Sequence, residues 1–221
     1  MILDDFTLIS GPCVLEDNDL NIEIGNQLAI FSSTLNIPIV FKASFDKANR
    51  SLPGSPRGPG LKNGIRLLEN VKNETGLPIL TDIHKVEQAE AIAEIADIIQ
   101  IPAFLCRQTD LIQAGAATGK ILNLKKAQFM APTDIFHSVE KARSAGCENI
   151  WLTERGTSFG YRNLVSDMRS LVIMHESGCP VIFDATHSIQ LPSASGGKSG
   201  GQREYLESLI RAAVAVGVEG V

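Results

Sequence analysis

A regular alternation of short apolar runs with longer amphipathic ones constrains this chain more than any other feature of its sequence. Seven of the short runs are rich in Ile, Val, Leu and Phe and show little polar alternation, which is typical of strands in a parallel sheet covered by helices. These strand candidates are residues 6–10, 39–43, 79–82, 98–101, 121–124, 150–153 and 181–184. An eighth run, 216–221, follows an Ala-rich segment and reaches the end of the chain.

Amphipathic segments lie between the strand candidates and predict helices, several of which end at Gly or Asn, as helices with left-handed caps do. They cover residues 20–35, 64–74, 86–96, 110–118, 135–145, 164–176 and 203–215. Seven strand–helix units and a partial eighth strand predict an α/β fold, a TIM (β/α)8 barrel that forms one domain over residues 1–221. Because complete barrels have about 250 residues, we expect this one to lack the end of strand 8 and the final helix.

A doubly wound open sheet is the alternative architecture. No GxGxxG motif follows the first predicted strand, which argues against a dinucleotide-binding form of that fold.

Composition and charge argue against several classes of function. The net charge is −5 and no long basic run is present, so a nucleic-acid-binding surface is not expected. No apolar run is long enough to span a bilayer, and the N-terminal segment is acidic where a signal peptide would be basic. The four cysteines form no CxxC pair, so we expect reduced thiols in a cytoplasmic protein.

Charged side chains follow most of the predicted strands, and the carboxyl ends of barrel strands meet at one mouth, where barrel active sites lie. At a single strand such residues are best interpreted as solvated loop positions, but their recurrence at six strands favours a binding site. Clustered cations in an acidic protein suit a phosphate-bearing, dianionic substrate. The residues expected to share this mouth are Lys42, Lys47, Arg50, Lys125 and Arg155, with Asp82, Glu154 and Asp184.

Cys13 and His187 follow the first and seventh predicted strands, which flank the eighth strand of a closed barrel. A thiolate and an imidazole suit Zn²⁺, Fe²⁺ or a similar ion, but two ligands do not make a metal site. A small buried hydrophobe is the commoner role of a free cysteine. His84 shares one side of its strand with Asp82, and we interpret it as a capping or loop residue. Trp151, inside a strand, is interpreted as a packing residue.

The segments at these strand ends resemble the 3-deoxy-D-manno-octulosonate 8-phosphate synthases over almost the whole chain. The matching motifs are GPCVLED, FKASFDKANRS, RGPGL, LTDIH, DIIQIPAFLCRQTDL, NLKKAQFMAP, WLTERGTSFGY, FDATHSIQLP and SGGQREY, in the order of the family. The resemblance implies a homotetramer of TIM barrels in cytoplasmic lipopolysaccharide biosynthesis. It also implies a transferase that joins phosphoenolpyruvate to D-arabinose 5-phosphate and releases phosphate.

The resemblance assigns roles to individual residues. The expected phosphoenolpyruvate-binding residues are Lys47, Gln100, Ala103 through its backbone, Lys125 and Arg155. The expected arabinose 5-phosphate residues are Asn49, Arg50 and Ser51, and Arg107 from a neighbouring subunit, with Lys42 and Asp82 near the aldehyde and hydroxyls. The expected catalytic residues are Lys47, Asp82, Lys125 and His187.

The resemblance also bears on a metal. Metal-dependent members of the family carry Cys where metal-independent members carry Asn, so Cys13 indicates the metal-dependent class, with His187 as the second ligand. The other ligands of the family are expected beyond residue 221. A divalent Zn, Fe or Mn ion is therefore expected, and no organic cofactor.

Three other functions stay open at this point. The related 3-deoxy-7-phosphoheptulonate synthases use erythrose 4-phosphate, although the KANRS motif differs from theirs. A Schiff-base aldolase would use Lys42 or Lys125 as its nucleophile. A non-catalytic subunit that binds a phosphorylated ligand is the third, because an incomplete strand 8 would leave unpaired edges on strands 1 and 7.

Overall fold

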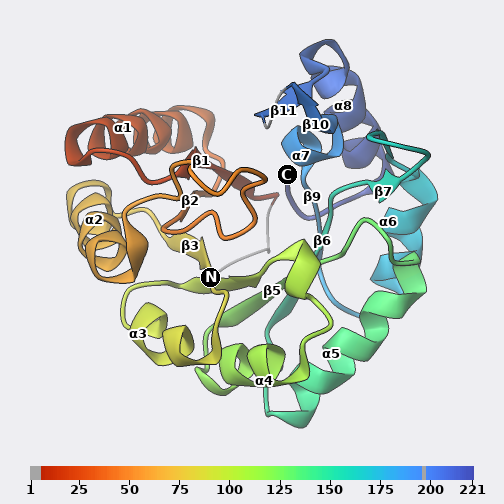
Figure 1. Cartoon of the computed structure of the whole chain (residues 1–221), viewed down its shortest axis with the longest axis horizontal. Coiled ribbons are helices and arrows are strands. Elements are labelled where there is room, and N and C mark those ends of the chain that lie inside the picture. The colour runs from red at the N-terminus through yellow and green to blue at the C-terminus, as the bar shows by residue number, and fades with distance from the viewer. Residues whose placement is uncertain (1–5, 196–197) are drawn as a thin grey trace.

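The computed structural model describes residues 6–195 and 198–221, and shows a curled parallel sheet surrounded by helices (Figure 1). Seven strands pair in the order β1-β2-β3-β4-β5-β6-β9, each parallel to its neighbours. They are β1 (Leu8–Val14), β2 (Ile39–Ser44), β3 (Ile79–Asp82), β4 (Ile98–Ile101), β5 (Ile121–Lys125), β6 (Ile150–Glu154) and β9 (Val181–Phe183). The predicted TIM-type barrel is confirmed.

The α-helices form an outer layer around the strands (Figure 1). They are α1 (Asn18–Leu35), α2 (Gly60–Thr75), α3 (Ala89–Ala93), α4 (Thr109–Ala117), α5 (Ile135–Ser144), α6 (Met168–His175), α7 (Ala185–Ser188) and α8 (Leu206–Val216). Single 3₁₀ turns lie at Val86–Gln88, Ala103–Leu105, Pro132–Asp134 and Arg203–Tyr205. No helix in the described ranges is long and apolar enough to cross a membrane.

Local sequence explains where the long helices begin and end. The Asp17 side chain accepts a hydrogen bond from the Leu20 backbone N–H (3.0 Å) and so caps the start of α1. At its end, Asn36 adopts a left-handed conformation with φ 52°. Gly76, with φ 68°, ends α2 in the same way, because glycine adopts this region without steric cost.

Several predicted elements differ from the structure. The first strand begins at Leu8 and continues past the predicted end at residue 10, through an irregularity in its pairing with β2. The predicted helix 164–176 begins only at Met168, because Leu164–Val165 (β8) pairs with Thr157–Ser158 (β7) in a small hairpin. The predicted helix 86–96 is a 3₁₀ turn followed by a five-residue helix. A second hairpin joins β10 (Gln190–Ser195) and β11 (Lys198–Gly201).

The predicted strand 216–221 is shorter than expected, but it occupies the eighth position of the barrel. Val216 still belongs to α8, and Gly220 forms parallel bridges to Thr7 on one side and Ile182 on the other. The Glu219 N–H donates to the Val181 carbonyl (3.0 Å), and the Thr7 N–H donates to the Glu219 carbonyl (2.9 Å). Residues 219–221 therefore join β9 to β1, and the expected unpaired edges of these two strands are bridged at this level.

Alternation along the strands separates two apolar cores. The larger core lies between the sheet and the helices and includes Phe41, Ile79, Ile99 and Phe183. The smaller core fills the inside of the barrel and consists of Val40, Leu80, Ile98, Trp151 and Ile182. The interpretation of Trp151 as a packing residue is confirmed. The inner core ends before the carboxyl ends of the strands, where polar side chains replace it.

Candidate active site

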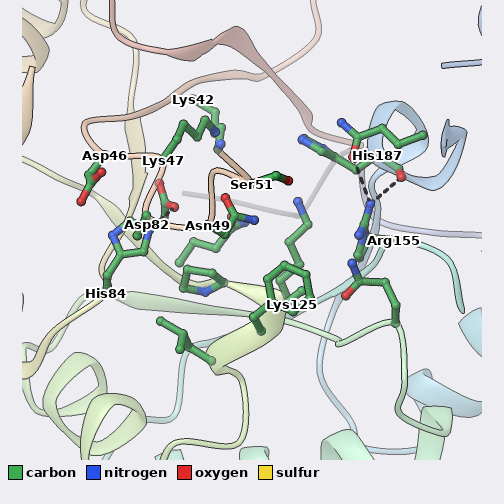
Figure 2. Close-up of a pocket in the computed structure, with 18 residues that line it drawn as sticks. Lys42, Asp46, Lys47, Asn49, Ser51, Asp82, His84, Lys125, Arg155 and His187 are labelled. Atoms are coloured by element: carbon green, nitrogen blue, oxygen red, sulfur yellow. Dashed lines mark hydrogen bonds and ion pairs between the residues drawn. The ribbon is translucent and has the colours of Figure 1, made fainter. Parts of the chain in front are cut away.

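A cavity of about 370 Å³ opens at the carboxyl ends of the strands, directly above the inner apolar core. Because side chains alternate along a strand, the residues two positions after Val40, Leu80 and Ile98 also point inward. These are Lys42, Asp82 and Gln100, and all three line the cavity. Figure 2 shows the labelled side chains pointing into one shared space from opposite walls.

Lys42 on β2 and Lys47 in the loop after it form one wall of the cavity. Lys42 and Lys47 both donate to the Ser44 hydroxyl, at 3.3 and 3.0 Å. Burial and the nearby charge of Lys42 lower the pKa of Lys47, while Asp82 acts in the opposite direction. Two ammonium groups held this close favour binding of an anion between them, because the anion relieves their repulsion.

Asp82 and His84 form a second group in the cavity. His84 Nε2 lies 3.2 Å from Asp82 Oδ2, and its side chain is only 12% exposed. Burial raises the pKa of Asp82, but the His84 hydrogen bond and the charges of Lys42 and Lys47 outweigh it and hold that pKa well below its usual value. The other carboxylate oxygen, Oδ1, is buried and has no partner among the described residues, so it can accept a substrate hydroxyl.

His84 lies in the loop after β3, as expected from the sequence, but it also contributes to the cavity, which was not expected. Its ring lines the cavity and meets the Phe45 ring edge-on, with centroids 6.0 Å apart. The signal was present in the sequence, because His84 follows Asp82 at the two-residue spacing of one strand face.

A third group runs from Lys125 through Asp184 to His187. Lys125 forms an ion pair with Asp184, and Asp184 Oδ2 also accepts a hydrogen bond from His187 Nδ1 (2.7 Å). Asp184 also caps α7, since its Oδ1 accepts from the His187 N–H (2.9 Å). Burial raises the pKa of Asp184, but Lys125 and His187 outweigh this and hold it well below its usual value.

Arg155 completes the cationic wall beside Lys125. Its Nη2 donates to the His187 carbonyl, and its Nε is buried without a partner in the described part of the chain. Burial lowers the pKa of Arg155, against the opposing effects of Asp184 and Glu154. A guanidinium with unused donors and an ammonium on the adjacent strand suit a carboxylate or phosphate ligand.

Cys13 lies at the edge of this arrangement, in a second cavity of about 450 Å³ that shares Lys42, Gln100, Lys125, His187 and Gln190 with the first. Its Sγ is 3.9 Å from His187 Nε2. The His187 hydrogen bond and the charges of Lys42 and Lys47 lower the pKa of Cys13 to about 5, although burial opposes them. Cys13 also has φ 69°, a strained value for a residue with a Cβ, at the irregular part of β1.

The pair fits half of a metal site. In a tetrahedral zinc site a thiolate sulfur and an imidazole nitrogen lie about 3.6 Å apart, close to the separation of Cys13 and His187. Asp184 Oδ2 accepts from His187 Nδ1, and this contact orients the ring so that Nε2 faces Cys13, as carboxylate contacts do in known metal-bound histidines. Within residues 6–195 and 198–221, however, no group of three or more His, Cys, Asp and Glu side chains is arranged to hold a metal ion.

All but three of the predicted site residues line one of the two cavities. Cys13 and Asp184 line the second cavity. Those that line the first cavity are Lys42, Lys47, Asn49, Ser51, Asp82, Gln100, Ala103, Lys125, Arg155 and His187. Arg50 does not line it, and its Nε donates to the Pro56 carbonyl (3.1 Å). Arg107 is exposed and also lies outside the lining. Glu154, expected at the mouth, points outward instead and pairs with Lys126.

The sequence reasoning also missed two glutamines. Gln128 and Gln190 line the cavity, and Gln128 Oε1 is buried without a partner among the described residues. Gln128 lies in the loop after β5 and Gln190 is the first residue of β10, so neither belongs to a barrel strand whose spacing would indicate its side-chain direction.

Comparison with known proteins identifies the family. The model of the DAHP synthetase I family matches residues 3–221. The chain belongs to this family. Three curated relatives carry the name 2-dehydro-3-deoxyphosphooctonate aldolase. The protein of Syntrophotalea carbinolica is 58% identical over 214 residues, which is 97% of this chain and 77% of the relative. That of Synechococcus sp. is 56% identical over 96% of this chain and 75% of the relative. The protein of Acidithiobacillus ferrooxidans is 54% identical over 98% of this chain and 77% of the relative.

Proposed function

We infer that this chain is a 3-deoxy-8-phosphooctulonate synthase. It condenses phosphoenolpyruvate with D-arabinose 5-phosphate and releases inorganic phosphate. The observation that carries the inference is 54–58% identity, over at least 96% of this chain, to relatives named 2-dehydro-3-deoxyphosphooctonate aldolase. The cavity supplies a chemical reason, because it concentrates cations in a chain whose net charge is −5.

We propose that Lys125 and Arg155 hold the phosphate and carboxylate of phosphoenolpyruvate, with Lys47 opposite them. The unpartnered Arg155 Nε and the buried ammonium of Lys125 support this arrangement. Gln100 lines the same cavity, and its side-chain nitrogen donates to Asn123 Oδ1 (2.7 Å), which fixes its position beside the proposed ligand. The lysines act as fixed charges, and alignment of the two substrates comes mainly from positioning and electrostatics.

The sugar phosphate is proposed to bind at the other end of the cavity. Asn49 and Ser51 lie in the loop after β2, near Lys42 and Asp82. The free Oδ1 of Asp82 accepts a sugar hydroxyl, and Lys42 polarises the aldehyde oxygen. Carbon 3 of phosphoenolpyruvate then forms a bond to the aldehyde carbon, and a water oxygen bonds to carbon 2 while one water proton passes to the former aldehyde oxygen. The bond between carbon 2 and the phosphate oxygen breaks, the second water proton leaves with the phosphate, and carbon 2 becomes a ketone.

We propose that Cys13 and His187 hold a divalent Zn, Fe or Mn ion. The 3.9 Å separation of their ligand atoms and the Asp184 contact on the far side of His187 support this. Such an ion supplies a Lewis acid beside the reacting groups. The remaining positions around it fall to water, substrate or groups outside the described residues.

We also propose that the enzyme is a cytoplasmic homotetramer in lipopolysaccharide biosynthesis. The exposed position of Arg107, away from the cavity of its own chain, suits a residue that reaches the site of a neighbouring subunit. Size-exclusion chromatography with light scattering measures the assembly.

Phosphate release is the direct test of the function. The chain is incubated with phosphoenolpyruvate and either arabinose 5-phosphate or erythrose 4-phosphate, with and without a chelator. Release with arabinose 5-phosphate alone, lost with chelator and restored by metal, is expected. Release with erythrose 4-phosphate alone would refute the substrate assignment in favour of the heptulonate reaction. Release that survives complete metal removal would refute the metal proposal and leave the substrate assignment in place.

A further inference from the structure

Lys126 and Glu154 form a buried ion pair on the outer face of the barrel strands, directly behind the proposed phosphoenolpyruvate site. Their side chains are 0% and 2% exposed, and Lys126 Nζ lies 3.4 Å from Glu154 Oε2. Neither residue lines the cavity. Lys126 is among the largest fully buried side chains of the described chain, so its charge requires partners to be tolerated.

The pair is joined to the site through the backbone. Lys125 and Arg155 point into the cavity, while their neighbours in sequence, Lys126 and Glu154, point to the opposite side of the same two strands. Lys125 is paired with Thr153 in the β5–β6 register, and the Lys126 N–H donates to the Thr153 carbonyl (2.8 Å). The outward ion pair and the inward cations therefore lie on opposite sides of one short stretch of paired backbone.

Glu154 fixes the peptide from which Arg155 projects. Its Oε1 accepts hydrogen bonds from the backbone N–H groups of Arg155 (2.8 Å) and Gly156 (2.7 Å). Its Oε2 accepts from the Ser170 hydroxyl (3.0 Å) at the start of α6. Gly156 has φ 85°, so the chain turns sharply just after the arginine.

Lys126 fixes the loop that follows Lys125 in the same way. Its Nζ donates to the carbonyls of Ala127 (3.2 Å) and Met130 (3.3 Å) and to the Thr157 hydroxyl (3.3 Å). Two apolar side chains of similar volume would stabilise the fold at least as well as a buried ion pair does. They would not hold two backbone N–H groups and two carbonyls in fixed places.

We propose that the Lys126–Glu154 ion pair is a positioning device for the phosphoenolpyruvate clamp, and this inference rests on the proposed function. By fixing the loops after β5 and β6, the pair sets the distance and direction between the Lys125 ammonium and the Arg155 guanidinium. A ligand with a carboxylate and a phosphate on adjacent atoms requires both groups to be in place at once.

The test compares three variants with the wild-type chain. Lys126→Met removes one charge of the pair. Lys126→Met/Glu154→Gln removes both charges and keeps an oxygen that accepts from the Arg155 and Gly156 N–H groups. Lys72→Met is the control, because Lys72 also forms an ion pair between two elements, with Asp97 (2.9 Å), but this pair is partly exposed and neither residue lines the cavity. Phosphoenolpyruvate Kd by calorimetry, the KM for each substrate, kcat and the unfolding temperature are measured for each folded variant.

Lys126→Met is expected to lower kcat/KM for phosphoenolpyruvate on the order of 10²-fold, the loss that a misplacement of about 1 Å produces. The KM for arabinose 5-phosphate is expected to stay unchanged. The double variant, which leaves no unpaired charge, is expected to fold and to recover part of the phosphoenolpyruvate affinity. Lys72→Met is expected to lower the unfolding temperature without weakening phosphoenolpyruvate binding.

Wild-type phosphoenolpyruvate Kd in both Lys126 variants, or an equal loss in Lys72→Met, would overturn the inference and leave the proposed function intact. A double variant as impaired as Lys126→Met would assign the effect to Lys126 alone and overturn the pair as the positioning unit. Failure of the wild-type chain to bind phosphoenolpyruvate would overturn the proposed function, and the inference with it.

Discussion

The pH dependence of alkylation at Cys13 tests the geometry of the barrel mouth without relying on catalysis. The His187 hydrogen bond, with help from Lys42 and Lys47, lowers the pKa of Cys13 to about 5 against the effect of burial. In the metal-free chain the thiolate is therefore expected to persist at pH values where an ordinary thiol is protonated. The side chain is only half-buried, so a small reagent reaches it.

The alkylation rate at pH 7 does not distinguish a thiol with a lowered pKa from an ordinary thiol, because two effects oppose each other. At pH 7 roughly 99% of a thiol with a pKa near 5 is ionised, against roughly 1% of a thiol with a pKa near 9, a gain of about 10². A less basic thiolate is a weaker nucleophile, and four pKa units at a Brønsted coefficient of about 0.4–0.5 reduce its rate about 40- to 100-fold. The two effects nearly cancel. Between about pH 8 and about pH 6 the ordinary thiol slows roughly tenfold per pH unit, while Cys13 keeps most of its rate.

The midpoint of the pH profile is therefore the observable. Iodoacetamide labelling, followed by mass spectrometry from about pH 4 to about pH 9, is expected to show a midpoint near 5 for Cys13. Burial raises the pKa of Cys106 and of Cys147, so both are expected to label slowly across this range. His187→Ala should move the Cys13 midpoint upward by removing the main cause of the shift. Added Zn²⁺ should protect Cys13 if the proposed metal site forms.

A wild-type midpoint between about pH 8 and about pH 9, the range of an unperturbed thiol, would refute the contact with His187 as described. An unchanged midpoint in His187→Ala would refute the cause assigned to the shift.

Two further perturbations test the surroundings of the site. Gly11→Ala is expected to lower the free energy of unfolding by about 1–3 kcal/mol, the usual cost of overpacking, because an added Cβ would overlap the Lys42 carbonyl oxygen. Thermal unfolding measures this against Gly54→Ala, where an added Cβ meets no described atom within 4 Å, and equal unfolding temperatures would contradict the argument. Asp184→Asn tests a carboxylate that belongs to an ion pair. Burial raises the pKa of Asp184, but the opposing effects, chiefly the charge of Lys125, hold it well below its usual value. The stability from this depressed pKa is present above about pH 4 and is lost as the pH falls through the folded value. The difference in free energy of unfolding between the wild type and Asp184→Asn, measured with urea, should therefore become smaller near pH 3. A difference that stays constant with pH would count against the ion pair.

The architecture could be predicted because periodicity reports burial directly. A strand buried on both faces, such as Ile98–Ile101, is apolar except where it reaches the site at Gln100, and a helix on the outside of a barrel is amphipathic. The boundaries were less predictable. Residues 164–176 carry a helical pattern, yet the first two pair with Thr157–Ser158, a contact that local spacing does not encode.

The site could be predicted only to the level of which strands contribute to it. Lys125 and Lys126 are identical in type and adjacent, yet one lies in the cavity and the other is fully buried behind it. Glu154 and Arg155 are also adjacent, yet Arg155 lines the cavity and Glu154 is buried behind it. A register difference of one residue reverses the direction of each side chain, and the sequence carries no independent signal for the register of a four- or five-residue strand. Strand-end position alone therefore placed Glu154 wrongly.

Closure of the barrel depends on the smallest residue in its last segment. Residues 219–221 fit between β9 and β1, and an added Cβ on Gly220 would overlap the Thr7 carbonyl oxygen. The Glu219 side chain strengthens this contact, because its Oε2 accepts from the Val181 N–H (2.7 Å) and lies 2.9 Å from His175 Nε2. Three residues therefore hold β1 and β9 at the spacing that brings Cys13 to His187. The sequence reasoning expected these two strands to lack partners, because it counted strand length, whereas the contact depends on a glycine that lets two backbones approach.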